Sequence, residues 1–300
     1  MVYSLLNDCN LCPRECHINR TGGQTGYCGQ TNLIKIARAS LHMWEEPCIS
    51  GDKGSGTVFF SGCSLKCVYC QNHNIANGLI GYEISENRLA EICCELQQKG
   101  AHNINLVTAD HFIPQIIFSL KIAKKIGLVL PVVYNCSGYT KVESIKLLEG
   151  YVDIYLPDFK YIDSSIGKKY SNCPDYYIYA SKAIKEMLRQ TGKPVFDSDG
   201  IMKKGVIVRH LMLPGCLKDS KRIIKYLFES FGNNIYISIM NQYTPLPHVC
   251  EFVELTVKIS TDEYNELVDY AISLGIENGF IQEGDTASES FIPDFNGEGI

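Results

Sequence analysis

From residue 51 onward, strand-like and helix-like segments alternate about six times along the chain. This alternation predicts a parallel sheet, because each strand needs a helical crossover before the next strand can run in the same direction. Six such units predict a partial (β/α)6 TIM-like barrel, short of the eight units that close a full barrel. The expected strands span residues 57–61, 104–108, 128–135, 152–157, 206–213 and 235–240.

The expected helices follow these strands and carry recognisable end signals. Ser85 is the expected cap of the first helix and Gly100 its stop, and Pro114 suits the first turn of the second. Apolar residues recur at helical spacing within these segments. Beyond the first, the expected helices span about residues 114–126, 141–149, 176–191, 219–231 and 262–274.

Three cysteines, Cys63, Cys67 and Cys70, follow the first expected strand in a C-x3-C-x2-C array. Such short spacings let three thiolates bind one iron–sulfur cube. Because a four-iron cluster normally takes four protein ligands, a set of three leaves one iron free. The alternatives are a zinc site with a fourth ligand elsewhere in the chain and a simple electron-transfer cluster. The position favours catalysis, since βα barrels place their chemistry at the carboxyl ends of the strands.

Residues 1–50 have little periodicity and predict a small Cys-rich metal-binding subdomain, separate from a barrel of residues 51–300. Four cysteines in a C-x2-C-x3-C-x11-C array form a complete ligand set, which suits a structural zinc or an auxiliary iron–sulfur cluster. Spacing does not separate these two metals, and we favour a second iron–sulfur cluster. The four are Cys9, Cys12, Cys16 and Cys28.

Composition restricts the surroundings of the protein. Fourteen of the 300 residues are cysteine, and clustered cysteines are read as metal ligands in a reducing compartment. Neither a signal-like amino terminus nor an apolar run near 18 residues is recognisable, so we expect a cytoplasmic protein without a membrane partner. The formal net charge of −5, without a basic block, predicts no nucleic-acid partner.

The cysteine triplet is accompanied by further segments at matching positions. These are Cys12-Pro13-Arg14, Gly54-Ser55-Gly56-Thr57 and residues 103–108, 133–139, 152–160 and 208–211. Taken together, the chain resembles the radical S-adenosylmethionine (SAM) superfamily, and within it the pyruvate formate-lyase activating enzyme-like proteins, in a subgroup of uncharacterised homologues. The resemblance covers essentially the whole chain and does not name a substrate.

The resemblance implies that Cys63, Cys67 and Cys70 are the catalytic ligands of a [4Fe–4S] cluster whose free iron binds SAM. It implies an oxidoreductase that reductively cleaves SAM to a 5′-deoxyadenosyl radical, with an electron donor such as flavodoxin or ferredoxin. Abstraction of hydrogen from a partner protein, as in glycyl radical activation, is the leading hypothesis. The alternatives are radical chemistry on a small metabolite or peptide, and a non-enzymatic iron–sulfur electron carrier.

Polar residues near the cluster loop and the strand ends are the candidates for SAM contact, because ligands of barrel folds bind there. Thr108 stands where the family carries a Gly-Gly-Glu-like stretch. Next to it, Asp110 and His111 either face substrate or lie in a solvated loop. The candidate residues are Tyr69, Asn72, Asn105, Thr108, Asn135, Ser137, Asp158, Lys160, Arg209 and Gln242.

Several of these candidates have a structural alternative. Asn135 and Ser137 also suit a turn. Asp158 and Lys160 also suit a surface ion pair. Arg209 either points inward, which argues for an anionic ligand, or outward to a helix carboxylate.

Two further segments leave alternatives open. Gln242 either contacts adenine or builds a rigid loop between the last strand and the prolines that follow. Residues 291–300 are expected either to form a loose tail or to fold back over the site.

Overall fold

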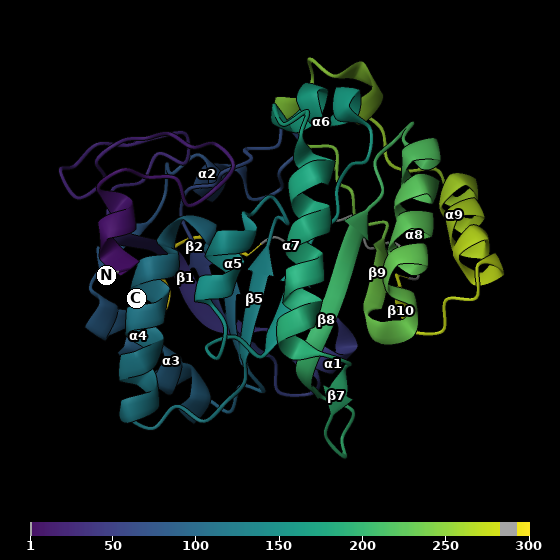
Figure 1. Ribbon diagram of the computed structural model, residues 1–300. Helices are drawn as coiled ribbons and strands as arrows, with labels where there is room; N and C mark the ends of the chain where they lie inside the picture. The colour runs from purple at the N-terminus through teal and green to yellow at the C-terminus, as the bar shows by residue number, and fades with distance from the viewer. Residues whose placement is uncertain (1, 283–292) are drawn as a thin grey trace.

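The computed structural model describes residues 2–282 and 293–300, and its centre is one mixed sheet in the order β10-β9-β8-β6-β5-β4-β2-β1-β3 (Figure 1). Six neighbouring strands run parallel and confirm the expected barrel units. The sheet is not closed, because its described path ends at β10 on one side and at β3 on the other. The six strands are β2 (Ser55–Phe60), β4 (Ile104–Val107), β5 (Val132–Cys136), β6 (Ile154–Pro157), β8 (Met202–Leu211) and β9 (Tyr236–Met240).

Four more strands extend this frame. β1 (Ile34–His42) pairs antiparallel with β2 and with β3 (Tyr82–Ile84). β10 (Gly279–Ile281) continues the parallel order beside β9, and β7 (Val195–Phe196) pairs with β8. The predicted boundary at residue 50 therefore falls between two paired strands, and residues 34–42 belong to the sheet.

Helices pack along the outer face of the sheet, as Figure 1 shows for α3, α4, α5, α7 and α8. All six expected helices are present, and Ser85 caps α3 by accepting a hydrogen bond from the Arg88 amide. α6 was not expected. The helices are α1 (Pro47–Ser50), α2 (His73–Ala76), α3 (Glu86–Gln98), α4 (Ile113–Lys125), α5 (Val142–Leu147), α6 (Ser164–Ser171), α7 (Tyr176–Thr191), α8 (Leu217–Phe231) and α9 (Thr261–Ser273). Short 3-10 helices span Val2–Leu6, Asp110–Phe112, Gly232–Asn234, Pro247–Val249 and Val253–Leu255.

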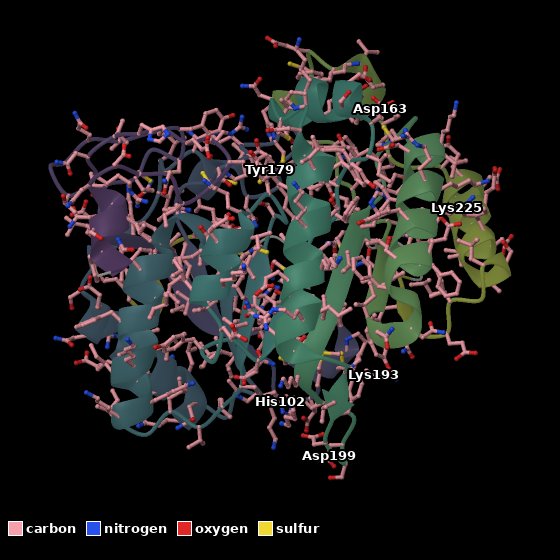
Figure 2. The ribbon with its side chains drawn as sticks, viewed as in Figure 1. His102, Asp163, Tyr179, Lys193, Asp199 and Lys225 are labelled. Atoms are coloured by element: carbon pink, nitrogen blue, oxygen red, sulfur yellow. The ribbon has the colours of Figure 1, made fainter. Side chains whose placement is uncertain are left out.

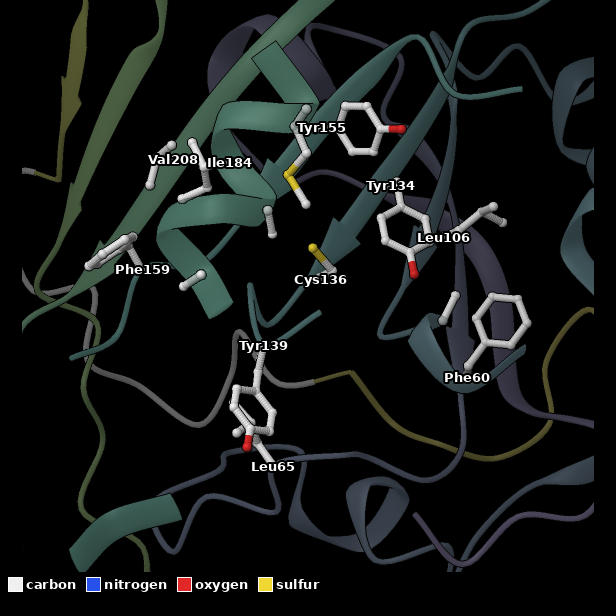
Figure 3. Packing of buried hydrophobic residues seen from close by; sticks show 14 of the residues in the cluster. Phe60, Leu65, Leu106, Tyr134, Cys136, Tyr139, Tyr155, Phe159, Ile184 and Val208 are labelled. Atoms are coloured by element: carbon white, nitrogen blue, oxygen red, sulfur yellow. The ribbon is translucent and has the colours of Figure 1, made fainter. Parts of the chain in front are cut away.

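The main core lies between the sheet and these helices. Burial is nearly complete for Tyr134, Tyr155 and Ile184, which come from β5, β6 and α7 and lie close together in Figure 3. Burying large aromatic and aliphatic side chains is the dominant favourable contribution to folding. The core therefore holds the strands in register and fixes the positions of the loops at their carboxyl ends.

None of the helices in the described ranges is long and apolar enough to cross a membrane.

The carboxyl-terminal tail packs against β1. The tail, residues 293–300, lies along β1, where the Ala39 amide donates to the Glu298 carbonyl at 2.8 Å. Arg38 forms an ion pair with Glu298 at 2.6 Å and donates to the Asp294 carbonyl at 2.8 Å. The described tail is thus folded back onto the sheet, and the expectation for residues 291 and 292 lies outside the described residues.

Candidate active site

A cavity of about 210 Å³ opens at the carboxyl ends of the parallel strands. It brings together residues from β1, the cluster loop, every following parallel strand up to β9, and the tail. Of the predicted site residues, it is lined by Cys63, Cys67, Tyr69, Cys70, Asn72, Thr108, Asn135, Ser137, Asp158, Lys160, Arg209 and Gln242. All of the residues predicted to contact the cluster of the triplet or SAM therefore line this one cavity, except Asn105.

A wider, shallower hollow of about 630 Å³ lies at the opposite end of the strands, where Figure 2 labels His102 and Asp199. Its lining includes the aromatic side chains of Phe196, Tyr236 and Phe280. Among the described residues, its lining holds one cysteine, Cys48, and one ion pair, between His102 and Asp52. We assign the chemistry to the smaller cavity because the triplet and the buried charges are there.

The three triplet cysteines lie on the loop after β2 and face the cavity from one side. The Leu65 amide lies 3.3 Å from the Cys63 sulfur and donates to it. Burial, followed by the neighbouring Cys67 thiol, raises the pKa of Cys63 to about 11. Burial and the two other thiols raise the pKa of Cys70 to about 12. At neutral pH these sulfurs become thiolates when a bound cationic group stabilises them.

The residues present fit an iron–sulfur cluster. In the described ranges, no group of three or more His, Cys, Asp or Glu side chains is arranged so that it could hold a metal ion. A [4Fe–4S] cube binds each cysteine at a different iron, so its ligands stand further apart than those of a single ion. The loop offers three cavity-facing sulfurs and an amide N–H donor to one of them, which is the support that ligand sulfurs receive in metal sites.

A network of largely buried charged side chains lines the same cavity as the triplet. The Arg209 guanidinium donates to Glu45 Oε2 at 3.0 Å, to Asp158 Oδ1 at 3.2 Å and to Asn135 Oδ1 at 2.6 Å. Lys160 pairs with Asp158 at 2.7 Å, and these two side chains are only 15% and 20% exposed. Asp158 and Lys160 therefore form an internal ion pair, and the alternative of a surface pair is wrong.

The electrostatics of this network follow from burial and pairing. Burial raises the pKa of Glu45, and Arg209 opposes that rise. Burial also acts against the charge of Asp158, but Lys160 and Arg209 outweigh it and lower the pKa of Asp158. Arg209 points inward, which is the first of the two alternatives given for it. Its negative partners, however, are the side chains of Glu45 and Asp158. An anionic ligand is thus not needed to explain the buried guanidinium.

Asn105 corrects one prediction. Its side chain is fully buried and donates to Glu45 Oε1 at 3.0 Å, outside the lining of the cavity. Asn105 is the second residue of β4, so it lies short of the carboxyl end of the strand where it was expected, and Glu45 contacts its side chain. Asn105 therefore positions Glu45 and does not reach a ligand.

Thr108 lines the cavity with a left-handed backbone, at φ 57°. β-branched residues rarely adopt this conformation, and such strain persists where the surrounding structure enforces it, often at functional sites. The Thr108 amide donates to the Asn135 carbonyl at 2.8 Å, which fixes the bend between β4 and the following turn. The bend after β4 thus has a backbone conformation that glycine adopts more readily than threonine.

The segment after β5 combines a turn with cavity-facing groups. Gly138 has φ 76°, and a side chain there would clash with the Asp158 carbonyl oxygen. Asn135 and Ser137 line the cavity on the way into this turn. The turn and the ligand-facing role are therefore compatible at these two residues.

His210 follows Arg209 in β8 and points to the opposite face of the strand. There its ring nitrogen hydrogen-bonds the Phe159 carbonyl, as the alternation of side chains along a strand predicts.

Gln242 lines the cavity beyond β9, and its amide oxygen accepts a hydrogen bond from Gln282 at 3.1 Å. The Gln282 side-chain oxygen in turn accepts the backbone amides of Asn241 and Gln242. A rigid loop and a cavity contact are thus combined at this position.

Asp110 and His111 lie in neither of the places expected for them. Both are buried, at 1% and 2% exposure, and neither lines the cavity. Asp110 accepts hydrogen bonds from Thr140 at 2.6 Å and Tyr134 at 3.3 Å, and burial raises its pKa to about 6. His111 binds the Ser61 carbonyl at 2.7 Å, and burial lowers its pKa to about 3. The 3-10 turn that they form directs them into the protein.

The amino-terminal cysteines line one small cavity together with Arg20 and His111. Burial raises the pKa of Cys12 to about 12, and the three other thiols contribute in the same direction, so the four sulfurs interact. The Tyr27 amide donates to Cys16 Sγ at 3.3 Å. Arg20 is 1% exposed and lies 3.8 Å from the Cys9 sulfur, and among described residues no carboxylate pairs with it. The four cysteines therefore fit a site in which their thiolate forms neutralise the positive charge of the Arg20 guanidinium.

Sequence reasoning missed the side of the cavity that comes from β1 and the segment after it. His42, Trp44 and Glu45 all line the cavity, and the tail adds Pro293. His42 packs edge-on against Phe59 at 5.8 Å, and burial lowers its pKa to about 4. Glu45 and Glu46 stand side by side before Pro47 in an otherwise apolar stretch. This pair of acids was the signal that could have indicated a functional segment here.

Comparison with known proteins agrees with this geometry. The family model of the radical SAM superfamily matches residues 57–241. The chain belongs to the radical SAM superfamily. An uncharacterized protein of Methanocaldococcus jannaschii is 27% identical over 281 residues, which is 90% of this chain and 76% of that relative.

Solved structures give lower similarities to this radical SAM protein. SuiB of Streptococcus suis bound to S-adenosylmethionine has 13% identity and a TM-score of 0.46, over 74% of this chain and 48% of SuiB. HydG, a maturase of the [FeFe]-hydrogenase, has 16% identity and a TM-score of 0.49, over 74% of this chain and 50% of HydG. The chain thus spans about half the length of both.

Proposed function

We propose that this radical SAM protein is an enzyme that cleaves SAM at a [4Fe–4S] cluster held by Cys63, Cys67 and Cys70. The observation that carries the proposal is that these three cysteines and the largely buried Asp158–Lys160 pair line one and the same cavity. When bound, the cluster supplies the electron that splits SAM into methionine and a 5′-deoxyadenosyl radical. A set of three sulfurs leaves one iron for the amino and carboxylate groups of SAM.

The residues around the triplet suit the charges of SAM. Lys160 uses one of its three N–H donors on Asp158, so two remain for the SAM carboxylate. Asn135 and Ser137 offer short polar contacts for the carboxylate or ribose, and Gln242 for adenine. Arg209 donates a hydrogen bond to one carboxylate oxygen of Asp158, and Lys160 donates to the other. Arg209 thereby fixes the carboxylate that orients Lys160. These roles are positional, and each follows from a side chain that lines the cavity.

We propose a partner protein as the substrate, with hydrogen abstraction of the kind used to activate glycyl radical enzymes. An electron donor such as flavodoxin or ferredoxin would reduce the cluster. We place the protein in the cytoplasm. All 14 of its cysteines are free thiols, and the cytoplasm is a compartment that keeps thiols reduced. These assignments rest on the resemblance to pyruvate formate-lyase activating enzymes.

A second candidate is radical chemistry on a small metabolite or peptide. The observation that favours it is the tail, because Pro293 lines the cavity and Phe295 packs against Phe59 with ring centroids 5.5 Å apart. A wall supplied by the tail narrows the opening through which a protein loop would enter. The absence of any glycyl radical enzyme from the same genome would favour this candidate, and its presence beside this gene would favour the first.

We further propose that the amino-terminal cysteines bind a second metal centre, an iron–sulfur cluster in preference to zinc. Burying a guanidinium without a counter-ion is costly, and among the described residues Arg20 donates hydrogen bonds to the Thr31 and His111 carbonyl groups and to the Cys9 sulfur but to no carboxylate. Four thiolates on a metal centre supply the missing negative charge. Metal analysis of a variant lacking the triplet cysteines would identify this centre.

The test is anaerobic reconstitution with iron and sulfide, reduction with dithionite, and addition of SAM. Wild-type protein should release 5′-deoxyadenosine and methionine, measured by chromatography. Cys67→Ala should abolish the release, because one cluster ligand is lost. Cys9→Ala should retain it at least in part. Cys250→Ala is the matched control, since this cysteine is exposed and lies outside both sites.

Two outcomes would contradict the proposal. An intact cluster without SAM binding or cleavage would make the protein an electron carrier. Retention of the same cleavage rate in Cys67→Ala would show that the triplet does not hold the cluster.

A further inference from the structure

The carboxyl end of α6 lies directly against the cluster loop. The Val68 amide donates to the Tyr170 carbonyl at 2.9 Å. The hydroxyl of Ser171, the last residue of α6, donates to Cys67 Sγ at 2.9 Å. Ser171 is only 3% exposed, so this hydrogen bond is shielded from water and is stronger than it would be at the surface.

Ser171 is also the end of a chain of hydroxyl groups that begins at the cavity. The Tyr69 hydroxyl lies 2.7 Å from that of Tyr161, and the Tyr161 hydroxyl lies 2.7 Å from that of Ser171. Tyr69 lines the cavity, and Tyr161 is buried. Three hydroxyl groups thus connect the ligand cavity to one cluster cysteine.

Counting hydrogens gives this chain a direction. A cysteine that binds iron is a thiolate and only accepts, so the hydrogen of Ser171 must point at Cys67. The hydrogen of Tyr161 must then point at Ser171, and that of Tyr69 at Tyr161. All three O–H dipoles point toward the cluster, and each bond strengthens the next. The oxygen of the Tyr69 hydroxyl then stands at the start of the chain and remains able to accept a hydrogen bond.

The amino-terminal subdomain holds this arrangement in place. Arg14 donates to the Ser171 carbonyl at 2.9 Å, to the Asn172 carbonyl at 2.6 Å and to the Ser64 carbonyl at 2.8 Å. A cation at the carboxyl end of a helix is favourable, and these bonds satisfy carbonyl groups that the helix leaves unpaired. Arg14 therefore joins the end of α6 to the loop that carries the triplet.

We propose that Ser171 is a positioning residue for Cys67 and that the chain Tyr69–Tyr161–Ser171 raises the reduction potential of the cluster. Reduction adds negative charge to the cluster and its sulfurs. A hydrogen bond to a ligand sulfur stabilises that charge, and such bonds are one of the main determinants of cluster potentials. The inference rests on the proposed function, because it requires the cluster to be bound by the triplet.

The test is a potentiometric titration of the reconstituted full-length protein without SAM, followed by electron paramagnetic resonance. The signal that changes when SAM is then added identifies the cluster with the free iron. Ser171→Ala should shift the equilibrium toward the oxidised cluster by about tenfold, equivalent to about 59 mV for one electron. Tyr161→Phe should shift it in the same direction by less, because the bond from Ser171 remains.

Ser164→Ala is the matched control, since Ser164 is an exposed serine in the same helix. Unchanged potentials in both Ser171→Ala and Tyr161→Phe, with intact clusters, would overturn the inference. If Ser171→Ala does not retain a cluster, the Tyr161→Phe potential decides. A wild-type protein whose cluster does not respond to SAM would contradict the proposed function instead.

Discussion

Replacement of Arg209 by methionine tests whether the buried network holds the cavity together. The guanidinium is 15% exposed and its partner Glu45 is 7% exposed, so the pair is largely shielded from solvent. Arg209→Met removes three hydrogen bonds and leaves Glu45 and Asp158 without their shared cation. Breaking a buried pair in this way costs about 3–5 kcal/mol. This loss is a large fraction of the typical stability of a domain, which is about 5–15 kcal/mol.

Adding Glu45→Gln to Arg209→Met should recover part of this loss, because the double variant no longer buries an unpaired Glu45 charge. We expect a non-additivity of about 1–3 kcal/mol, as for residues in one network. The assay is anaerobic urea unfolding at pH 7 of wild type, both single variants and the double variant, followed by circular dichroism. A loss below about 1 kcal/mol in Arg209→Met, or additive losses in the double variant, would refute the reasoning.

Three further changes test other parts of the structure. Gly138→Ala should destabilise the protein by about 1–3 kcal/mol more than Gly215→Ala, because both have positive φ but only the first would clash with the Asp158 carbonyl; urea unfolding measures the difference. Asp110 has its pKa raised from 3.8 to about 6, so its ionisation removes about 3 kcal/mol of stability as pH rises from about 4 to 6. Asp110→Asn should lack this fall in unfolding free energy, and a parallel fall in the variant would contradict the assignment. Arg38→Ala should speed hydrogen exchange of the tail, measured by mass spectrometry, and unchanged protection would show that the tail is held by other contacts.

The parallel strands and their helices could be predicted because each is a local pattern. A strand such as β6 is buried on both faces and reads as an apolar run, and α3 has an apolar face between a cap and a glycine stop. The cysteine triplet could be predicted for the same reason, since its spacing lies within one loop. β1 was missed because its burial does not alternate with a period of two residues.

The rest of the site could not be predicted because it depends on contacts between distant segments. Whether Asn105 reaches the cavity is decided by Glu45, which lies 60 positions earlier and covers it. His111 was expected either to face substrate or to lie in a solvated loop, but it is buried against Arg20, 91 positions away in the cysteine-rich segment. Periodicity reports how a residue faces its own element and contains no information on which other segment lies above it.

The contact between β1 and the tail has a consequence for the order of folding. The hydrogen bond from Arg38 to Asp294 joins positions 256 residues apart. Closing so long a loop is entropically costly, and contacts of this range form late and slowly. We therefore expect the more local pairing of the barrel strands to precede the docking of the tail. In that order, the side of the cavity that Pro293 lines would be closed last.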